Sequence, residues 1–266
     1  MHWSRVKTIL IIMFLCVDIV LFVGLYMLQG GDRIDSDTIL KTVSVLADNG
    51  IVIDRKLISP KISSMGIVEA ENLRADRDDF ARLLLDDKTA VFKDGAYKSG
   101  SKKITFDGVA IKGENLIENI KPFTADNIKS ELETLGIKAK RVLSETDSEI
   151  VLRQEFDGNP VFETEISVTP ENVLTGYFLT GKQTESYSKS EDTRLIPVCS
   201  VLINLIDIPQ AKGETVKSIE TGYTLGDSVG NDTYTLISVF PAYRIRTETG
   251  KIFVFDAISG DLLYQK

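Results

Sequence analysis

Histidine, cysteine and tryptophan are scarce in this chain, whose 266 residues include one His, two Cys and one Trp. The only histidine, His2, lies at the N-terminus. Ser-His-Asp and Cys-His catalytic groups and His-ligated zinc sites are therefore excluded from the rest of the chain. The two cysteines, Cys16 and Cys199, are far apart, and Cys16 falls inside an apolar run. No intrachain disulfide is expected, so the hydrophobic core alone has to stabilise the fold.

Sequence motifs that carry chemistry are also missing. The chain has no P-loop, GxSxG, HExxH, CxxC or EF-hand pattern. Carboxylates cluster at 76–79 and at Asp86 and Asp87, where a helix N-cap and a solvated face explain them better than an acid–base pair. Cys199 lies on the apolar side of a predicted helix and is interpreted as a buried structural thiol. We predict no catalytic, cofactor-binding or metal-binding site, and a hydrolase that uses paired carboxylates is the least favoured alternative.

Basic residues are fewer than acidic residues, 31 against 39, which gives a formal net charge of −8 at pH 7. A nucleic-acid-binding surface needs an excess of Lys and Arg, so nucleic acid is not expected as a partner. Adhesion to an anionic surface by overall charge is disfavoured for the same reason.

One long apolar run is present, at residues 8–28, and Asp18 is its only charged residue. As a helix with a rise of about 1.5 Å per residue it is about 31 Å long, enough to cross the hydrocarbon core of a bilayer. Arg5 and Lys7 precede the run, whereas acidic residues dominate after it, so the positive-inside rule places residues 1–7 in the cytoplasm. The chain is thus expected to be a single-pass protein of the cell membrane, with an extracytoplasmic C-terminal domain.

A cleaved signal peptide is the main alternative to an anchor. Signal peptides have an apolar core of about 7 to 15 residues and a small-residue cleavage site. The run here is longer, and the exit sequence Tyr26-Met27-Leu28-Gln29 has no such site. An uncleaved transmembrane helix is therefore favoured.

Asp18 lies near the middle of this run. A central Asp costs about 2.5 to 3.5 kcal/mol on insertion, and each Leu, Ile, Phe or Val returns about 0.3 to 0.6 kcal/mol. The many apolar residues outweigh the single acid, so the helix is still expected to insert. Because intramembrane acids are usually functional, we predict that Asp18 makes a partner-binding contact with a second transmembrane helix. The alternative is a tolerated Asp without a partner.

Beyond the apolar run, the hydrophobic pattern is typical of an α+β fold. A helix followed by an antiparallel meander is predicted twice, so the second half reads as two repeats. The predicted organisation is a cytoplasmic tail (1–7), a transmembrane helix (8–28), a linker (29–36), a first α+β subdomain (37–122) and a second α+β part (123–266) whose repeats span 123–182 and 190–266.

Individual elements follow from capping residues, turn residues and periodicity. Helices are predicted after the candidate caps Asp37, Asp76 and Thr124, and at 195–206, where Pro197 falls in the first turn. Asp-Gly and Ser-Gly pairs predict hairpin turns between 89 and 112. Strands of the two repeats are predicted at 137–143, 149–156, 161–168, 173–179, 216–225, 233–240, 243–249, 251–256 and 262–264.

The order of several short motifs resembles the YycI (WalI) family. The opening Trp3-Ser4-Arg5-Val6-Lys7-Thr8-Ile9 is similar to the start of that family, and the final segment at 255–262 resembles the terminal turn of PepSY-type modules. Tyr243 stands where the family usually has Trp. The other segments that carry the resemblance are 156–162, 174–177, 212–216, 222–223 and 240–245.

The resemblance implies a non-enzymatic regulator. YycI-like proteins act with the YycH protein on a sensor histidine kinase of the WalK (YycG) type, which controls cell-wall metabolism, and they contact it largely through transmembrane helices. Asp18 would then be a determinant of helix–helix contact, and the lipid bilayer would surround residues 8–28. The alternative is an anchored PepSY-like module that binds a partner or inhibits an envelope protease.

Overall fold

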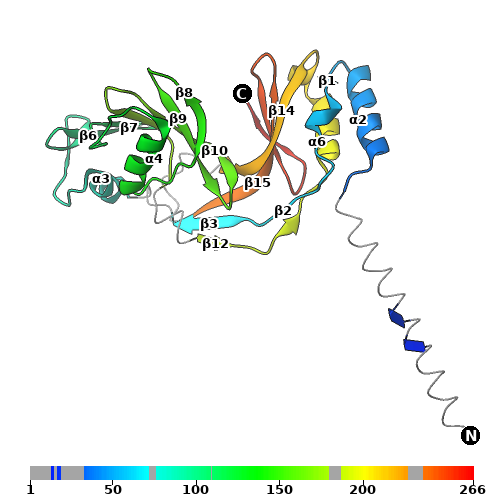
Figure 1. The fold of residues 1–266 in the computed structure, drawn as a ribbon, viewed down its shortest axis with the longest axis horizontal. Helices are drawn as coiled ribbons and strands as arrows, with labels where there is room; N and C mark the ends of the chain where they lie inside the picture. Colours follow the sequence, from blue (N-terminus) through cyan, green and yellow to red (C-terminus); the bar gives the residue numbers. More distant parts are fainter. Residues whose placement is uncertain are drawn as a thin grey trace, which may run out of the picture.

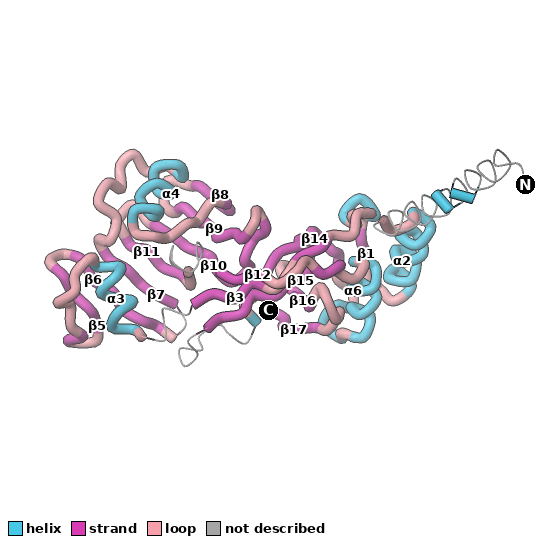
Figure 2. The backbone as a smooth tube through the Cα atoms, turned by 90° about the horizontal axis from the view of Figure 1, so that it is seen from below, coloured by secondary structure: helices cyan, strands magenta, loops and turns pink. Residues whose placement is uncertain are grey.

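The computed structural model describes residues 13–14, 17–18, 33–71, 76–108, 110–179, 187–226 and 236–266. This part of the chain forms an elongated α+β molecule dominated by β-sheet (Figures 1 and 2), which confirms the predicted α+β class. It has two lobes. The first lobe comprises residues 33–71 and 187–266, and the second lobe comprises residues 76–179.

The first lobe contains both the N-terminal and the C-terminal part of residues 33–266. Its helices are α2 (Ser36–Asp48) and α6 (Val198–Asn204). Its strands are β1 (Val52–Ile53), β2 (Ser64–Met65), β3 (Val68–Glu71), β12 (Tyr187–Lys189), β13 (Thr193–Arg194), β14 (Thr215–Thr224), β15 (Leu236–Thr247), β16 (Ile252–Asp256) and β17 (Leu262–Gln265).

The second lobe is formed by the middle of the chain. Its helices are α3 (Arg77–Leu85) and α4 (Ala125–Thr134). Its strands are β4 (Phe92–Lys93), β5 (Ala96–Ser99), β6 (Lys102–Asp107), β7 (Ala110–Glu114), β8 (Arg141–Glu145), β9 (Ile150–Phe156), β10 (Asn159–Val168) and β11 (Val173–Gly176).

Each lobe contains a helix followed by a four-stranded antiparallel meander. In the second lobe α4 precedes β8-β9-β10-β11, and in the first lobe α6 precedes β14-β15-β16-β17. The two meanders meet where β10 and β14 run parallel, with Val161 opposite Tyr223. The described strands other than β2 and β13 are thereby hydrogen-bonded into one continuous sheet.

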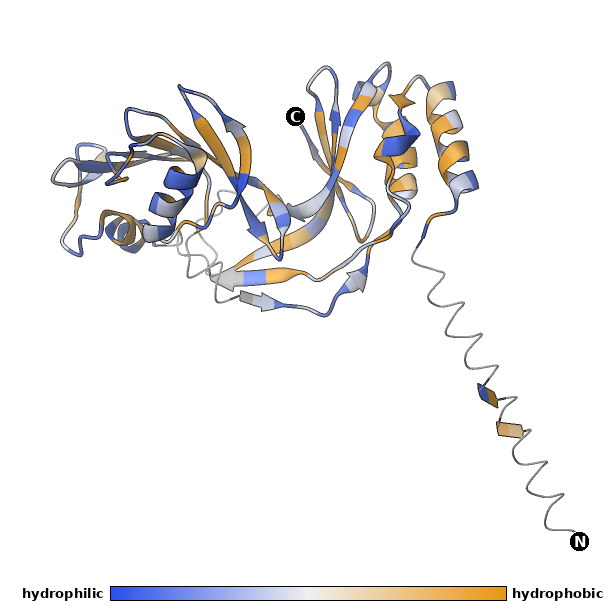
Figure 3. Cartoon of the chain, viewed as in Figure 1, coloured by the Kyte–Doolittle hydropathy of each residue, from blue (hydrophilic) through white to orange (hydrophobic). Residues whose placement is uncertain are grey.

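Two large apolar clusters lie at the centres of the lobes. The first contains Leu46 and Ile53 together with Leu202 and Phe253, and the second contains Phe80 together with Ile128. Figure 3 shows the apolar residues that α2 and α6 contribute to the first lobe. The first cluster also takes in Phe156, Val161, Tyr177 and Leu179 from the second lobe, so the lobes share apolar contacts where they meet.

The predicted first subdomain, 37–122, is divided between the two lobes. Its N-terminal part joins the first lobe, because β1 pairs with β14 and β3 pairs with β15. Its remainder, from α3 to β7, packs in the cluster of the second lobe. Neighbours in sequence therefore belong to different cores, since strand pairing here links residues far apart in the chain.

Two of the predicted helix caps are present. The Asp76 carboxylate accepts from the Asp79 N–H at 3.0 Å, and the Thr124 hydroxyl accepts from the Asn127 N–H at 3.4 Å. The third prediction was wrong by two residues, because Asp35 and not Asp37 caps α2. An N-cap needs extended backbone, which Asp35 has, with φ −65° and ψ 142°.

Two further predictions near the C-terminus need correction. The helix starts at Val198, so Pro197 is its N-cap residue and does not lie within the first turn. The predicted strands 233–240 and 243–249 are one strand, β15, that runs through Pro241. This proline falls where β15 stops pairing with β3 and begins pairing with β16, a gap in which its missing N–H is tolerated.

The predicted membrane span lies mostly outside the described residues. Of 8–28, only Met13, Phe14, Val17 and Asp18 are described, and all four are helical. Within the described part of the chain, no helix has the length and apolar character needed to cross a bilayer.

Candidate functional site

Asp18, the one site residue predicted from sequence, is helical and exposed. Its neighbour Val17 and the preceding Met13 and Phe14 are exposed as well, with 49%, 68% and 63% of their surface accessible. These apolar side chains therefore face away from the rest of the described chain.

A ring of charged side chains lies between the two meanders. It contains three arginines and two glutamates, Arg141, Arg153, Glu165, Glu220 and Arg244. Strand register explains the grouping, because Arg153 is opposite both Arg141 and Glu165, and Glu220 is opposite Arg244. Side chains on opposed positions of neighbouring strands point to the same face of the sheet.

The contacts of the ring cross from one lobe to the other. Arg244 of β15 donates to Glu220 through Nε at 2.9 Å, and its Nη1 lies 3.7 Å from Glu165 of β10. Arg141 of β8 lies 3.7 Å from Glu220 of β14, and Arg153 bonds to Glu165. The Arg244 guanidinium also stacks 4.5 Å above the Phe162 ring. The ring therefore ties the two meanders together with charge-assisted bonds.

Burial makes the charged form of two arginines in the ring energetically costly. The side chains of Arg153 and Arg244 are only 1% and 5% exposed. Burial, followed by the positive charge of Arg244, lowers the pKa of Arg153. Burial alone would raise the pKa of Glu220, but the hydrogen bond and charge of Arg244 outweigh it and lower that pKa. Nε and Nη1 of Arg153 have no hydrogen-bond acceptor among the described residues.

A half-buried carboxylate, that of Glu163, joins three strands. Glu163 of β10 accepts hydrogen bonds from the hydroxyls of Thr224 at 2.5 Å and Tyr264 at 2.6 Å, and from the Leu225 N–H at 3.0 Å. Burial and the Glu163 charge raise the pKa of the Tyr264 phenol well above its usual range. This cluster connects β10 to the ends of β14 and β17 and acts as a structural tie.

Glu214 makes a third polar cluster at the start of β14. Its carboxylate lies 2.8 Å from the Lys251 ammonium and accepts from the Thr249 hydroxyl at 2.5 Å. The hydrogen bonds from Lys251 and Thr249 lower the pKa of Glu214 to about 2. Glu214 lies in the segment 212–216, one of those that resemble the YycI family. Its contacts hold the turn that leads into β14.

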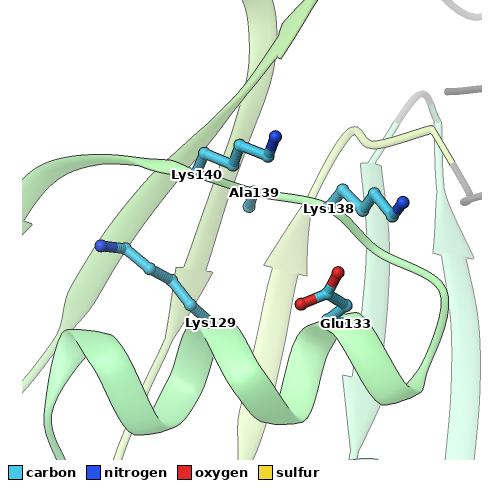
Figure 4. A pocket seen from close by; sticks show the side chains of 5 residues that line it. All are labelled: Lys129, Glu133, Lys138, Ala139 and Lys140. Carbon is cyan, nitrogen blue, oxygen red and sulfur yellow. The ribbon is translucent and has the colours of Figure 1, made fainter.

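A pocket of about 210 Å³ lies between α4 and the segment that leads to β8 (Figure 4). Lys129 and Glu133 of α4 and Lys138, Ala139 and Lys140 line it. A smaller pocket of about 70 Å³ lies among the 57–63 segment, the start of α6 and strands β14 and β15. Tyr243 lines this second pocket, and its hydroxyl donates to the Ile196 carbonyl at 2.9 Å.

Other sequence predictions concern single residues. Cys199 is buried in the core of the first lobe, as predicted for a structural thiol. Among the described residues, no three His, Cys, Asp or Glu side chains are grouped closely enough to hold a metal ion. The acidic cluster at 76–79 forms the N-cap and first turn of α3, and Tyr97 donates to Asp78 there.

Sequence reasoning missed the charged ring and the lysine pocket. The arginines and glutamates of the ring are spread over five strands, and nothing in their spacing along the chain brings them together. A local signal did exist for the pocket, because Lys138, Lys140 and Arg141 form a short basic run in an acidic chain.

Comparison with known proteins gives a likeness of shape at low identity. No protein-family model matches the chain, and no curated protein matches it. A structure of an uncharacterized protein from Eubacterium rectale ATCC 33656 is similar with a TM-score of 0.46 and 12% identity, covering 88% of this chain and 99% of that chain. The Bacillus megaterium YpeB C-terminal domain is similar with a TM-score of 0.36 and 12% identity, covering 72% of this chain and 95% of that chain. Function has to be inferred from the residues of this chain.

Proposed function

We propose that this chain is a non-enzymatic, membrane-anchored regulator of a two-component sensor histidine kinase that controls cell-wall metabolism. Residues 8–28 form the anchor, residues 1–7 lie in the cytoplasm, and the two lobes lie outside the cell membrane. The partners are a sensor kinase of the WalK type and a YycH-like protein, as the order of YycI-like motifs along the chain suggests.

The observation that carries this proposal is Asp18 within its apolar run. A carboxylate at the centre of a bilayer needs a polar partner, because lipid offers no hydrogen-bond donor. Asp18 is exposed and helical, so its carboxylate is accessible to a neighbouring protein. A transmembrane helix of the kinase or of the YycH-like protein supplies the donor.

The outer lobes offer surface for additional contacts. Val91 and Phe92 at the edge strand β4 are 63% and 60% exposed, at the end of the molecule formed by β4 to β6. Exposed apolar side chains on an unpaired edge are typical of protein contacts. Regulation then combines contact between helices in the membrane with contact between domains outside it.

A pull-down of the full-length chain from solubilised membranes tests this function. We expect the wild type to recover a histidine kinase with two transmembrane helices. The Asp18→Leu variant should recover about tenfold less, which corresponds to the loss of one interhelical polar contact of about 1 to 2 kcal/mol. Val17→Leu, a neighbouring apolar change, serves as the matched control and should behave as the wild type.

The two parts of the proposal fail separately. Equal recovery by Asp18→Leu and wild type would remove the role of Asp18 while leaving the regulator in place. Absence of any kinase from the wild-type sample would contradict the regulator itself.

The second candidate is an anchored PepSY-like module that binds a partner or inhibits an envelope protease. The presence of a helix followed by a four-stranded meander in each lobe favours this candidate. Inhibition of an envelope peptidase by the detergent-solubilised chain would support it, and unchanged peptidase activity at saturating chain would reject it.

A further inference from the structure

The lysine pocket beside α4 has a positively charged lining, although the chain as a whole is negatively charged. Three lysines and one glutamate line it, which gives the lining a net charge of about +2, whereas the whole chain has a net charge of −8. The excess positive charge is brought together by the fold, because Lys129 and Glu133 come from α4 and the other lysines come from the following segment.

Alternation of buried and accessible residues sets the orientation of that segment. Ile137 is fully buried and Ala139 is 3% exposed, so the side chains between and after them, Lys138 and Lys140, are directed outward. This alternation has the period of two of an extended segment, in which residues two apart in sequence lie on the same side. On α4, Lys129 and Glu133 are four residues apart and therefore also share one face.

Figure 4 shows how these side chains surround the pocket. Lys129 and Glu133 rise from α4 toward the segment, and Lys138 and Lys140 project from that segment. Lys129 and Lys138 point to opposite ends of the pocket. Lysine carries its ammonium on a flexible four-carbon stem, so a bound anion draws these groups inward without a change of the backbone.

The ion pair that Lys129 makes is weak competition for a ligand. Its ammonium lies 3.4 Å from Asp126, whose side chain is 96% exposed. Exposed pairs of this kind are screened by water and salt and contribute little. Among the described residues that line the pocket, Glu133 is the one carboxylate, and it opposes an anion there.

We propose that the pocket between α4 and residues 138–140 binds a phosphate group in its dianionic form, as free phosphate or a phosphate monoester. A phosphate monoester at neutral pH carries a charge of about −1.5 to −2, which matches the lining, whereas a carboxylate or phosphodiester carries only one negative charge. Lysine binds phosphate as a point charge. The volume of about 210 Å³ is enough for a small anion with part of its hydration shell.

This site goes beyond the proposed regulator function, and its test needs no kinase. The full-length chain in detergent micelles is titrated calorimetrically with inorganic phosphate at low salt. We expect saturable binding that weakens as sodium chloride is added, because the attraction is electrostatic.

Substitutions locate the site. The triple variant Lys129→Ala, Lys138→Ala, Lys140→Ala should bind about tenfold or more weakly, since three charge-assisted contacts are lost. Glu133→Gln should bind a few-fold more tightly, because the opposing carboxylate is removed. Lys98→Ala, an exposed lysine on β5, is the matched control and should leave affinity unchanged.

Titration with other phosphates distinguishes the sources. Glycerol 3-phosphate, a monoester, should bind as inorganic phosphate does, whereas soluble glycerophosphoglycerol, the phosphodiester headgroup of phosphatidylglycerol, should bind more weakly. Stronger binding of glycerophosphoglycerol than of glycerol 3-phosphate would show that the pocket prefers a lipid headgroup to a phosphate dianion and would overturn the assignment. Absence of saturable phosphate binding, or binding unchanged in the triple variant, would overturn the site itself.

Discussion

Single residues at the contact between the meanders decide how closely the strands approach. Gly222 of β14 is the clearest case, because a Cβ at this position would lie 2.4 Å from the Pro160 carbonyl oxygen and 2.8 Å from the Phe162 ring. Phe162 in turn stacks under the Arg244 guanidinium. A side chain at position 222 would therefore separate the strands and disturb the charged ring.

The Gly222→Ala variant is expected to lower the free energy of unfolding by about 1 to 3 kcal/mol, the usual cost of overpacking. Urea denaturation followed by circular dichroism measures this change. Lys217→Ala, an exposed change on the same strand, should stay within about 0.5 kcal/mol of the wild type. Equal stability of Gly222→Ala and wild type would show that the strands can move apart without loss.

Glu214 gives the fold a dependence on pH. Its folded pKa is about 2, below the ordinary value of 4.5, so the charged form is favoured by folding. The stabilisation is complete above the unfolded pKa and is lost as the pH falls from about 4.5 through about 2. Glu214→Gln should therefore be less stable than the wild type at pH 7, and the difference should shrink toward pH 2.

Thermal unfolding of both proteins between pH 2 and pH 7 checks this expectation. Glu118→Gln is a suitable comparison, because Glu118 is 76% exposed and lies 3.6 Å from Lys102 in a surface pair. A Glu214→Gln curve parallel to that of the wild type over this range would contradict the assigned role of the carboxylate.

At the scale of elements, caps and turns account for where helices and hairpins begin and end. Thr124 caps α4, and Asp94-Gly95 and Asp157-Gly158 form hairpin turns in which both residues have positive φ. Positive φ at both central positions is the requirement of the type I′ turn. These signals are local, and the helices and hairpins that depend on them could be predicted from the sequence.

Removing the α4 cap tests this local contribution. The Thr124→Ala variant should have a free energy of unfolding lower by about 1 kcal/mol, because the Asn127 N–H loses its acceptor. Chemical denaturation measures the loss, and Ser130→Ala on the exposed side of the same helix should have little effect. A cost in Ser130→Ala equal to that in Thr124→Ala would show that capping is not the cause.

Element boundaries were harder to predict where partners change along a strand. The sequence near Pro241 predicts two strands, because proline is rare in central strands. The observed β15 is continuous because its neighbour changes from β3 to β16 at that point. The same limit applies to Asp37, since only the backbone conformation of Asp35 identifies the true cap of α2.

At the scale of the whole molecule, the charged ring between the lobes is the feature that the sequence predicts least. It is also the feature whose loss should lower the free energy of unfolding most. Removing one member of a buried ion network leaves its partners without compensation, which costs about 3 to 5 kcal/mol. The Arg244→Met variant should lose this amount of unfolding free energy, because Glu220 is left between the two lobes without its main partner.

The double variant Arg244→Met, Glu220→Leu should be more stable than Arg244→Met alone, since the Glu220 carboxylate is no longer left without its main partner. Arg141→Met changes a 40% exposed member of the ring and should cost less than about 1 kcal/mol. Denaturant unfolding of these variants and of the single variant Glu220→Leu separates these cases. A double variant as unstable as the sum of its parts would contradict coupling across the ring.

The sequence by itself determined the α+β class, two of the helix caps, the hairpin turns at Asp-Gly pairs, the buried state of Cys199 and the apolar run around Asp18. These follow from composition, periodicity and contacts between residues close along the chain. Only the tertiary structure decided that residues 37–122 are shared between two cores, that five charged residues form a ring, and that Lys129 lines one pocket with Lys138 and Lys140. Each of these depends on strand pairing or packing between distant segments, which hydrophobic pattern alone does not specify.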